Sequence, residues 1–207
     1  MNLSKLIKTG AHELDMSISD NQIVLLIKYI NLLIKWNKVF SLTAITNPVE
    51  IAKFHILDAL SGIKYFSLAS NILDVGSGMG VPAVILAIIY PDKKISAIDS
   101  NAKKTSFLTQ VKIELALHNL VVLNKRVEDM SVVEQYDIIT SRAFADLNLF
   151  IKLTTHVLSE NGYYLAFKGG KGIEEANLIL NWQVNVLKLN VPFLDAKRFL
   201  TKIEKYD

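Results

Sequence analysis

The feature that most constrains this chain is a glycine-rich loop between a short apolar run and a helical run. Residues 72–75 read as a strand, the loop that follows carries Gly76, Gly78 and Gly80, and residues 81–90 read as a helix. Glycines let a backbone turn tightly and approach a ligand closely, and a helix N-terminus offers free N–H groups to an anion. An ordinary strand–helix turn does not need three glycines. The pattern therefore predicts a ligand-binding strand–loop–helix unit.

Short β-rich runs alternate with helical runs along the rest of the chain beyond Asn71, as in βαβ units around a parallel sheet. The expected strands are 72–75, 94–98, 120–124, 136–140, 163–167, 183–190 and 197–204. The expected helices are 81–90, 101–117, 147–158 and 173–180. Because the last two strands are consecutive, we expect an antiparallel edge on an otherwise parallel sheet.

The first third of the chain reads as helices. Ser19-Asp20 caps an amphipathic helix over 21–40, and Pro48 lies in the first turn of a helix over 49–66. We place a joint at 66–71. The prediction is an α/β fold of the Rossmann-like kind, with a mostly parallel seven-stranded sheet flanked by helices in residues 67–207 and an N-terminal helical extension in residues 1–66.

Composition removes several function classes. The chain has 207 residues and no cysteine, which excludes disulfide scaffolds, thiolate zinc sites and cysteine nucleophiles. The four histidines are too scattered to indicate a metal site, so we expect no metal. No apolar run reaches the ~18 residues of a membrane span, and the N-terminus lacks a signal-peptide pattern. We therefore expect a cytoplasmic protein without a membrane segment.

Glycine spacing distinguishes two cofactor classes. A nicotinamide fingerprint, G-x-G-x-x-G, would need glycine at position 81, where Val81 stands. The pattern Asp74-x-Gly76-x-Gly78-x-Gly80 is instead typical of class I methyltransferases, which bind S-adenosylmethionine. Asp99 ends the next strand, where an acid accepts the ribose hydroxyls of an adenosine. The alternative for Asp99 or Ser100 is a cap on the helix near Asn101.

Other motifs are informative by their absence. Residues 140–144 read Thr-Ser-Arg-Ala-Phe, where amino-group methyltransferases often carry Asp/Asn-Pro-Pro-aromatic. Residues 168–172 read Lys-Gly-Gly-Lys-Gly, but Leu165 and Gly172 stand where a Walker A motif needs glycine and Ser/Thr. That run is either a glycine-rich exit from the fifth strand or a basic loop near a bound phosphate. Residues 126–129 lie where adenine binds in this fold, or form a solvated charged turn.

These residues together resemble the bacterial ribosomal small-subunit methyltransferase G family, also called glucose-inhibited division protein B. The resemblance covers nearly the full chain. Its most family-specific segments are Trp36-Asn37, Arg142-Ala143-Phe144 and Lys168-Gly169, besides the glycine loop with Pro82. The remaining matches are 41–45, 55–58, 99–100, 103–104 with 107–108, and 126–128. The chain departs from the family's usual residues at Ser41, Ala59, Val81 and Ala83.

The resemblance implies N7-methylation of one guanine in the decoding-centre loop of 16S ribosomal RNA, with S-adenosylmethionine as donor. By family position, cofactor contacts fall on Gly76, Val81, Val127, Glu128 and Arg142. The motif and ribose arguments add Asp74, Gly78 and Asp99. The implied partner is 16S rRNA or the small ribosomal subunit, and we expect a monomer.

Methylation at guanine N7 requires no general base, because N7 carries a lone pair and no proton. Catalysis then rests on positioning, and Arg142 and Phe144 are the candidates for it. Arg142 binds the cofactor carboxylate, approaches an RNA phosphate or forms a structural ion pair. Phe144 stacks on the base or packs in the core. An arginine fork across O6 and N7 would block the reaction, so we expect guanine to be held by stacking and by its Watson–Crick edge.

The net charge of +3 permits a nucleic-acid partner without requiring one. Candidates for RNA phosphate contacts, each with a solvated side chain as the alternative, are Lys103, Lys104, Lys168, Lys171 and Arg198. His55 and Asp58 read as a hydrogen-bonded pair or a cap contact rather than a metal site, and Trp36 reads as a packing residue. Two other functions stay open: a methyltransferase acting on a small molecule or protein, and a non-catalytic ribosome-assembly factor with the same fold.

Overall fold

Seven strands form one sheet within the described part of the chain, which covers residues 2–142, 144, 146–170 and 172–206 of this computed structural model. The strands are β1 (Asn71–Val75), β2 (Lys94–Ile98), β3 (Leu120–Leu123), β4 (Tyr136–Ser141), β5 (Leu158–Lys168), β6 (Gln183–Leu189) and β7 (Arg198–Glu204). Their order is β3-β2-β1-β4-β5-β7-β6. β1 to β5 run parallel, and β7 lies antiparallel between β5 and β6. The expected α/β sheet with an antiparallel edge is confirmed.

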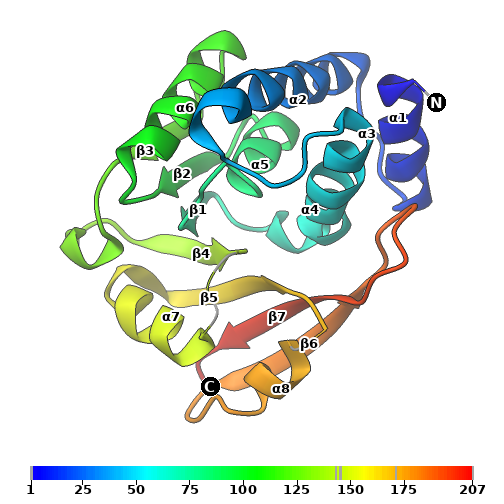
Figure 1. The fold of residues 1–207 in the computed structure, drawn as a ribbon. Helices are drawn as coiled ribbons and strands as arrows, with labels where there is room; N and C mark the ends of the chain where they lie inside the picture. The colour runs from blue at the N-terminus through cyan, green and yellow to red at the C-terminus, as the bar shows by residue number, and fades with distance from the viewer. Residues whose placement is uncertain (1, 143, 145, 171, 207) are drawn as a thin grey trace.

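Helices cover the sheet on both sides (Figure 1). They are α1 (Leu3–Glu13), α2 (Asp20–Phe40), α3 (Pro48–Ile51), α4 (Asp58–Gly62), α5 (Ala83–Ile89), α6 (Ala102–Glu114), α7 (Leu147–Thr154) and α8 (Gly172–Ala176). The strand order changes direction at β1, since β2 and β3 lie on one side of it and β4 and β5 on the other. Open parallel sheets bind ligands outside the carboxyl ends of the strands at such a point.

Each face of the sheet has its own apolar core. Ile72 and Ile95 belong to a large core that also contains side chains of α1, α2, α4, α5 and α6. Leu73 and Val75 belong to a second core with α7. Side chains alternate between the two faces of a strand, so the consecutive residues Ile72 and Leu73 contribute to opposite cores. Burial on both faces explains why β1 and β4 carry the consecutive apolar pairs Ile72-Leu73 and Ile138-Ile139 rather than an alternating pattern.

The long helix α2 begins where the sequence predicts. Ser19 and Gln22 form a capping box, in which the Gln22 N–H donates to Ser19 Oγ (3.2 Å) and the Ser19 N–H donates to Gln22 Oε1 (2.9 Å). The next helical stretch runs from Pro48 to Phe66, but it is not uniform. Residues Ala52–Leu57 form a π-helical turn between α3 and α4. Such turns hold one extra residue and occur frequently at functional sites.

Several expected boundaries differ from the structure. The expected helix over 147–158 ends at Thr154 and continues as a 3-10 turn to Val157. Strand β5 begins at Leu158 rather than at residue 163, because Leu158 pairs with Tyr136 across a register shift in β4. Helix α8 ends at Ala176 instead of residue 180. Beyond Ala176 the helical hydrogen bonds give way to i to i−3 bonds, from the Leu178 N–H to the Glu175 carbonyl and from the Ile179 N–H to the Ala176 carbonyl. Helix α1, whose bounds the sequence did not give, has Asn2 as its N-cap.

The N-terminal helices share the larger core with the sheet. Leu26 and Leu33 of α2 are fully buried in the same cluster as Val84 of α5 and Phe107 of α6. The division into an extension of residues 1–66 and a sheet domain of residues 67–207 stays a prediction. Within the described residues, no helix has the length and apolar character that crossing a membrane requires.

We predict that Leu33→Ala lowers the free energy of unfolding by about 2–5 kcal/mol, because it leaves a cavity in that core. Val39→Ala on the same helix is the matched control, since Val39 is 74% exposed. Urea unfolding followed by circular dichroism measures both variants. Two separate transitions in the wild-type protein, with only the first affected by Leu33→Ala, would mean that the helical segment is an independent unit.

Candidate functional site

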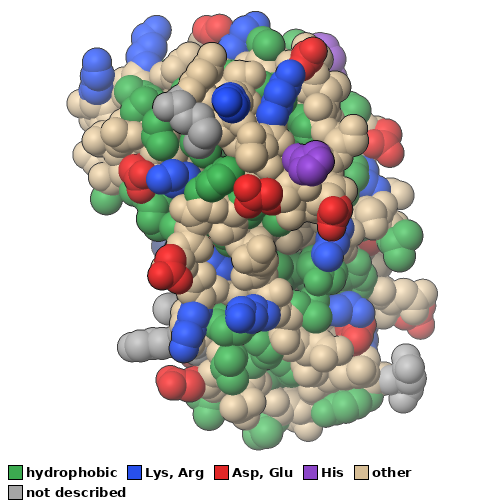
Figure 2. Space-filling model, turned by 90° about the vertical axis from the view of Figure 1, so that its right-hand side faces the viewer, with side chains coloured by type: hydrophobic (Ala, Val, Ile, Leu, Met, Phe, Trp, Pro, Cys, Tyr) green, Lys and Arg blue, Asp and Glu red, His purple; other side chains and the backbone are tan. Residues whose placement is uncertain are grey.

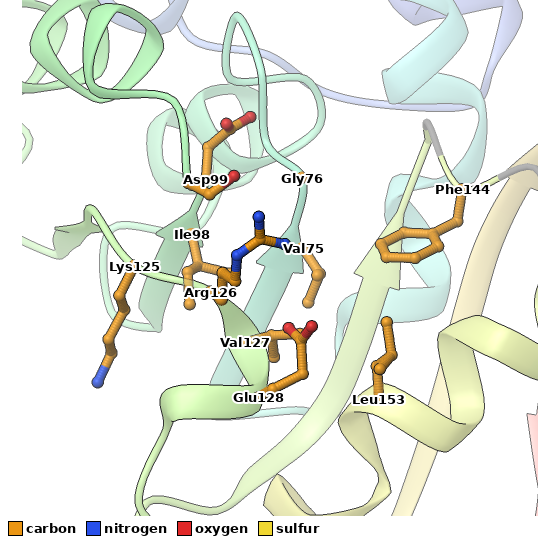
Figure 3. Close-up of a pocket in the computed structure, with 11 residues that line it drawn as sticks. Val75, Gly76, Ile98, Asp99, Lys125, Arg126, Val127, Glu128, Phe144 and Leu153 are labelled. Atoms are coloured by element: carbon orange, nitrogen blue, oxygen red, sulfur yellow. The ribbon is translucent and has the colours of Figure 1, made fainter.

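A cavity of about 290 Å³ opens at the carboxyl ends of β1, β2 and β3. Its apolar walls include Ile98, Val127 and Phe144, and its polar groups include Asp99 and Glu128. Asp99 lies on one side of the cavity and Phe144 on the other (Figure 3). Besides the ends of β1, β2 and β3, the lining includes Phe144 after β4 and Leu153 of α7. Apolar walls with a few placed polar groups are typical of small-molecule sites.

The glycine loop forms the edge of this cavity through hydrogen bonds to β2. The N–H groups of Gly76 and Ser77 both donate to the Ile98 carbonyl, at 2.9 and 3.1 Å. Gly76 has a positive φ of 68°, and a Cβ built on it would meet nothing within 4 Å. Gly76 also lines the cavity. A ligand can therefore approach the backbone here without meeting a side chain.

Asp99 both holds the loop and lines the cavity. Its Oδ2 accepts from the Gly78 N–H at 3.0 Å, and its Oδ1 accepts from the Asn101 N–H at 2.9 Å. Lys104 Nζ lies 3.4 Å from Oδ2. The N-cap of α6 is Asn101, whose side chain accepts from the Lys103 N–H at 3.0 Å, so the alternative interpretation of Asp99 or Ser100 as that cap is wrong. The ligand contact of Asp99 stays a prediction. A carboxylate has about four acceptor positions, so it can receive further hydroxyl donors.

Asp74 lies behind the loop and is 1% exposed. Its Oδ2 accepts from the Ala83 N–H at 3.3 Å, whereas its Oδ1 is buried and has no hydrogen-bond partner. Burial raises the pKa of Asp74 to about 7 and nearby Asp99 adds to this rise, while the Ala83 N–H, Arg142 and the Ser77 hydroxyl offset part of it. A buried carboxylate with one unsatisfied oxygen is costly unless a ligand completes it.

Arg142 follows β4 and is held by residues of the π turn and of α4. Its Nη2 donates to the Phe54 carbonyl at 3.0 Å and lies 3.0 Å from His55 Nδ1. Its Nε lies 3.6 Å from Asp58 Oδ2. Its Nη1 is buried and has no partner. Asp58 is also paired with Arg198, whose Nε donates to Oδ1 at 3.1 Å.

A second basic residue fixes the segment that carries Phe144. Lys168 Nζ donates to the Phe144 carbonyl at 2.6 Å and to Glu175 Oε2 at 2.5 Å. Its side chain is only 8% exposed. The Phe144 ring packs against Phe150 at 5.2 Å between ring centroids while it lines the cavity. Phe144 thus packs against the second core and also lines the cavity, and its stacking on a base stays a prediction.

The structure brings only part of the expected site to the cavity surface. The expected cofactor residues that line it are Gly76, Asp99, Val127 and Glu128. The others, Asp74, Gly78, Val81 and Arg142, are not among its lining residues: Gly78 bonds Asp99, and Val81 is buried in the larger core. The cofactor roles stay predictions.

The expected RNA-binding residues differ in their surroundings. Lys103 is exposed at the start of α6. Lys104, Lys168 and Arg198 have acidic partners in Asp99, Glu175 and Asp58. Lys171 lies outside the described residues. On the face beside α1 and the β6–β7 turn, basic and acidic side chains are interspersed rather than gathered in one basic patch (Figure 2).

Sequence reasoning missed contacts that join distant segments to the site. The Tyr29 hydroxyl on α2 donates to the Met79 carbonyl in the glycine loop at 2.7 Å. Leu153 of α7 lines the cavity. In the sequence, Tyr29 is simply one residue of an apolar helix face. Nothing in the local sequence indicates that its hydroxyl bonds the glycine loop. Lys125 and Arg126 also line the cavity. The sequence indicated this for Arg126, as part of residues 126–129, but not for Lys125.

Comparison with known proteins assigns the family. Residues 22–200 match the family model described as rRNA small subunit methyltransferase G. The chain belongs to this family. It is 45% identical to a ribosomal RNA small subunit methyltransferase G of Janthinobacterium sp. (strain Marseille), over 98% of this chain and 95% of that protein. The corresponding protein of Herminiimonas arsenicoxydans is 43% identical, with 98% and 96% covered.

Solved structures of other methyltransferases have a fold similar to that of this chain. A ribosomal protein L11 methylase from Lactobacillus delbrueckii subsp. bulgaricus has a TM-score of 0.57 at 16% identity, over 72% of this chain and 77% of that one. A putative O-methyltransferase from Klebsiella pneumoniae has a TM-score of 0.59 at 12% identity, over 86% and 90%. The chain thus has the class I methyltransferase fold, the fold of enzymes that use S-adenosylmethionine.

We predict that alanine at Gly80 lowers the free energy of unfolding more than alanine at Gly76 does. A Cβ at Gly80 would lie 2.5 Å from Val84 Cγ2 and 2.6 Å from Leu108 Cδ2, at a φ of 93°. Backbone strain of about 1–2 kcal/mol plus overpacking of about 1–3 kcal/mol is therefore expected for Gly80→Ala. Gly76→Ala carries the backbone strain alone.

Urea unfolding of both variants, with Gly170→Ala as the control in open space, tests this ranking. A larger loss of stability in Gly76→Ala than in Gly80→Ala would contradict it.

Proposed function

We propose that this enzyme transfers a methyl group from S-adenosylmethionine to N7 of one guanine in 16S ribosomal RNA. The observation that carries the proposal is a pair of unsatisfied buried atoms of opposite charge, Asp74 Oδ1 and Arg142 Nη1. The amino-acid end of S-adenosylmethionine carries an ammonium and a carboxylate. Arginine suits a carboxylate, and a carboxylate accepts from an ammonium. The residues present therefore fit the charges of that end.

The nucleoside end of the same molecule fits the cavity itself. Asp99 is the acid that would accept the ribose hydroxyls. Ile98 and Val127 provide apolar walls for an adenine ring, and Glu128, next to Val127, is the acceptor for its amino group. The eight residues of the proposed cofactor site are Asp74, Gly76, Gly78, Val81, Asp99, Val127, Glu128 and Arg142.

The chemistry needs positioning rather than proton transfer. S-adenosylmethionine supplies an electrophilic methyl group on a positively charged sulfur. The lone pair of N7 forms the new N–C bond, the C–S bond breaks, and its electron pair stays on sulfur. Phe144, held at the cavity wall by the Lys168 contact to its carbonyl, is placed to stack on a base. Neither Arg142 nor Phe144 acts as an acid or base in this proposal.

A ribosomal substrate fits the basic residues at the cavity. Lys125 and Arg126 line it, and Lys103 and Lys104 lie in the first turn of the adjacent helix α6. Such side chains are the usual partners of RNA phosphates. We extend the proposal to a cytoplasmic monomer without a metal, with residues 1–66 as a helical extension of the cofactor-binding domain 67–207.

The direct test is to incubate the protein with methyl-labelled S-adenosylmethionine and small ribosomal subunits that lack the modification, and then to digest the RNA to nucleosides. We expect label in N7-methylguanosine at one site. Arg142→Met should lower kcat/KM about 10- to 100-fold, the equivalent of a lost charged hydrogen bond. Lys152→Met, at an exposed position of α7, is the control. Label in another nucleoside, in protein or in a small molecule would contradict the assigned substrate.

Cofactor binding should also release a proton. With a pKa of about 7, roughly half of the Asp74 carboxyls are protonated at pH 7, and an ammonium beside Oδ1 favours the charged form. Titration calorimetry with S-adenosylhomocysteine in buffers of different ionisation enthalpy should show proton release that is larger at pH 6 than at pH 8. Asp74→Asn should abolish this difference. Equal release by the wild type and the variant would exclude Asp74 as its source.

A further inference from the structure

The guanidinium of Arg142 is surrounded by three groups from one short stretch of the chain. The Phe54 carbonyl and His55 Nδ1 both lie 3.0 Å from Nη2, and Asp58 Oδ2 lies 3.6 Å from Nε. The π turn Ala52–Leu57 carries the first two groups, and α4 begins with the third. Together these contacts take two of the three guanidinium nitrogens and leave Nη1 without a partner.

His55 has a defined protonation state in this arrangement. A guanidinium has only donors, so His55 Nδ1 must accept from Arg142 Nη2. The ring proton then lies on Nε2, which donates to Thr43 Oγ1 at 3.1 Å. The side chain is 4% exposed, and its burial together with the neighbouring Arg142 lowers the pKa of His55 to about 4. The ring is therefore neutral at physiological pH, and its two nitrogens have different tasks.

Thr43 is itself fixed by the end of α2. Its N–H donates to Asn37 Oδ1 and its carbonyl accepts from Asn37 Nδ2, both at 2.8 Å. Thr43 Oγ1 also accepts from the Ile45 N–H at 3.1 Å. A continuous hydrogen-bonded series thus runs from Asn37 through Thr43 and His55 to Arg142. Each member has a partner on both sides until Arg142 Nη1 is reached.

We propose that His55 is a positioning residue, which orients Arg142 by accepting through Nδ1 so that Nη1 is directed to the carboxylate of S-adenosylmethionine. Thr43 Oγ1 receives the Nε2 proton of the His55 tautomer that makes this possible, and Asn37 fixes Thr43 through its backbone. The inference rests on the proposed function, because it assumes that Arg142 binds that carboxylate. It adds that the affinity for the cofactor is set partly by side chains of the N-terminal helical segment that do not line the cavity.

Two substitutions separate this role from simple packing. His55→Asn keeps an acceptor near the position of Nδ1 and loses the contact to Thr43. His55→Gln places its amide near the position of Nε2 and loses the acceptor for Arg142. We expect His55→Asn to bind S-adenosylhomocysteine within about threefold of the wild type, and His55→Gln to bind it about 10- to 100-fold more weakly, as for a lost hydrogen bond to a charged group. His118→Asn and His118→Gln, at an exposed position, are the matched controls.

A double-mutant cycle with Arg142→Met strengthens the test. If His55 acts through Arg142, His55→Gln should cause no further loss of affinity in the Arg142→Met background. Equal effects of His55→Asn and His55→Gln, or full additivity with Arg142→Met, would overturn the proposal. Failure of the wild-type protein to bind S-adenosylhomocysteine would instead overturn the proposed function, so the two failures are distinguishable.

A measurement on the wild-type protein covers the case in which a variant does not fold. The ¹⁵N chemical shifts of the His55 ring report which nitrogen carries the proton. We expect a neutral ring protonated at Nε2 near pH 7. A ring protonated at Nδ1, or a doubly protonated ring at that pH, would contradict the proposal without any substitution.

Discussion

The structure around the site depends on the buried carboxylate of Asp58. It receives Arg142 from the end of β4 and Arg198 from the start of β7, and it lies at the beginning of α4. Three segments that are far apart in sequence therefore meet at one anion. Burial raises the pKa of Asp58, and the two guanidinium groups offset part of that rise. Removing one partner of such a buried pair is strongly destabilising, because the remaining charge stays buried without compensation.

Arginine can take part in this buried charge cluster and bind other groups at the same time. Each guanidinium can bond in several directions within its plane, so Arg142 contacts Asp58, His55 and a backbone carbonyl at once. Lysine, with a single compact charge, could not replace those contacts. Arg142 thus belongs simultaneously to the ion-pair cluster and to the proposed cofactor site. The structural and the ligand-binding interpretations that the sequence left open are compatible in one side chain.

Much of the sheet could be predicted from the sequence because its signals are local. Apolar runs, glycines and caps identify β2 at its observed bounds and α2 to within one residue. The π turn at Ala52–Leu57 could not be predicted, because it depends on what Phe54 and His55 contact in the folded protein. The spacing of the loop glycines and the acid at the end of the next strand predicted a ligand site, and Gly76 and Asp99 line the cavity. The contact of Tyr29 with Met79 did not, since it joins positions 50 residues apart that share no motif.

The place of β7 in the sheet has a consequence for biosynthesis. β7 is inserted between β5 and β6, although it is the last strand in sequence, and it carries Arg198, which is 140 positions beyond Asp58. Chains are made from the N-terminus, and folding during translation begins there. Strands β1 to β5 can pair before β7 has been synthesised, but Asp58 then has one of its two arginines. Until β6 and β7 have been synthesised, the nascent protein must therefore leave Asp58 exposed to water, or bury its charge with only Arg142 as a partner.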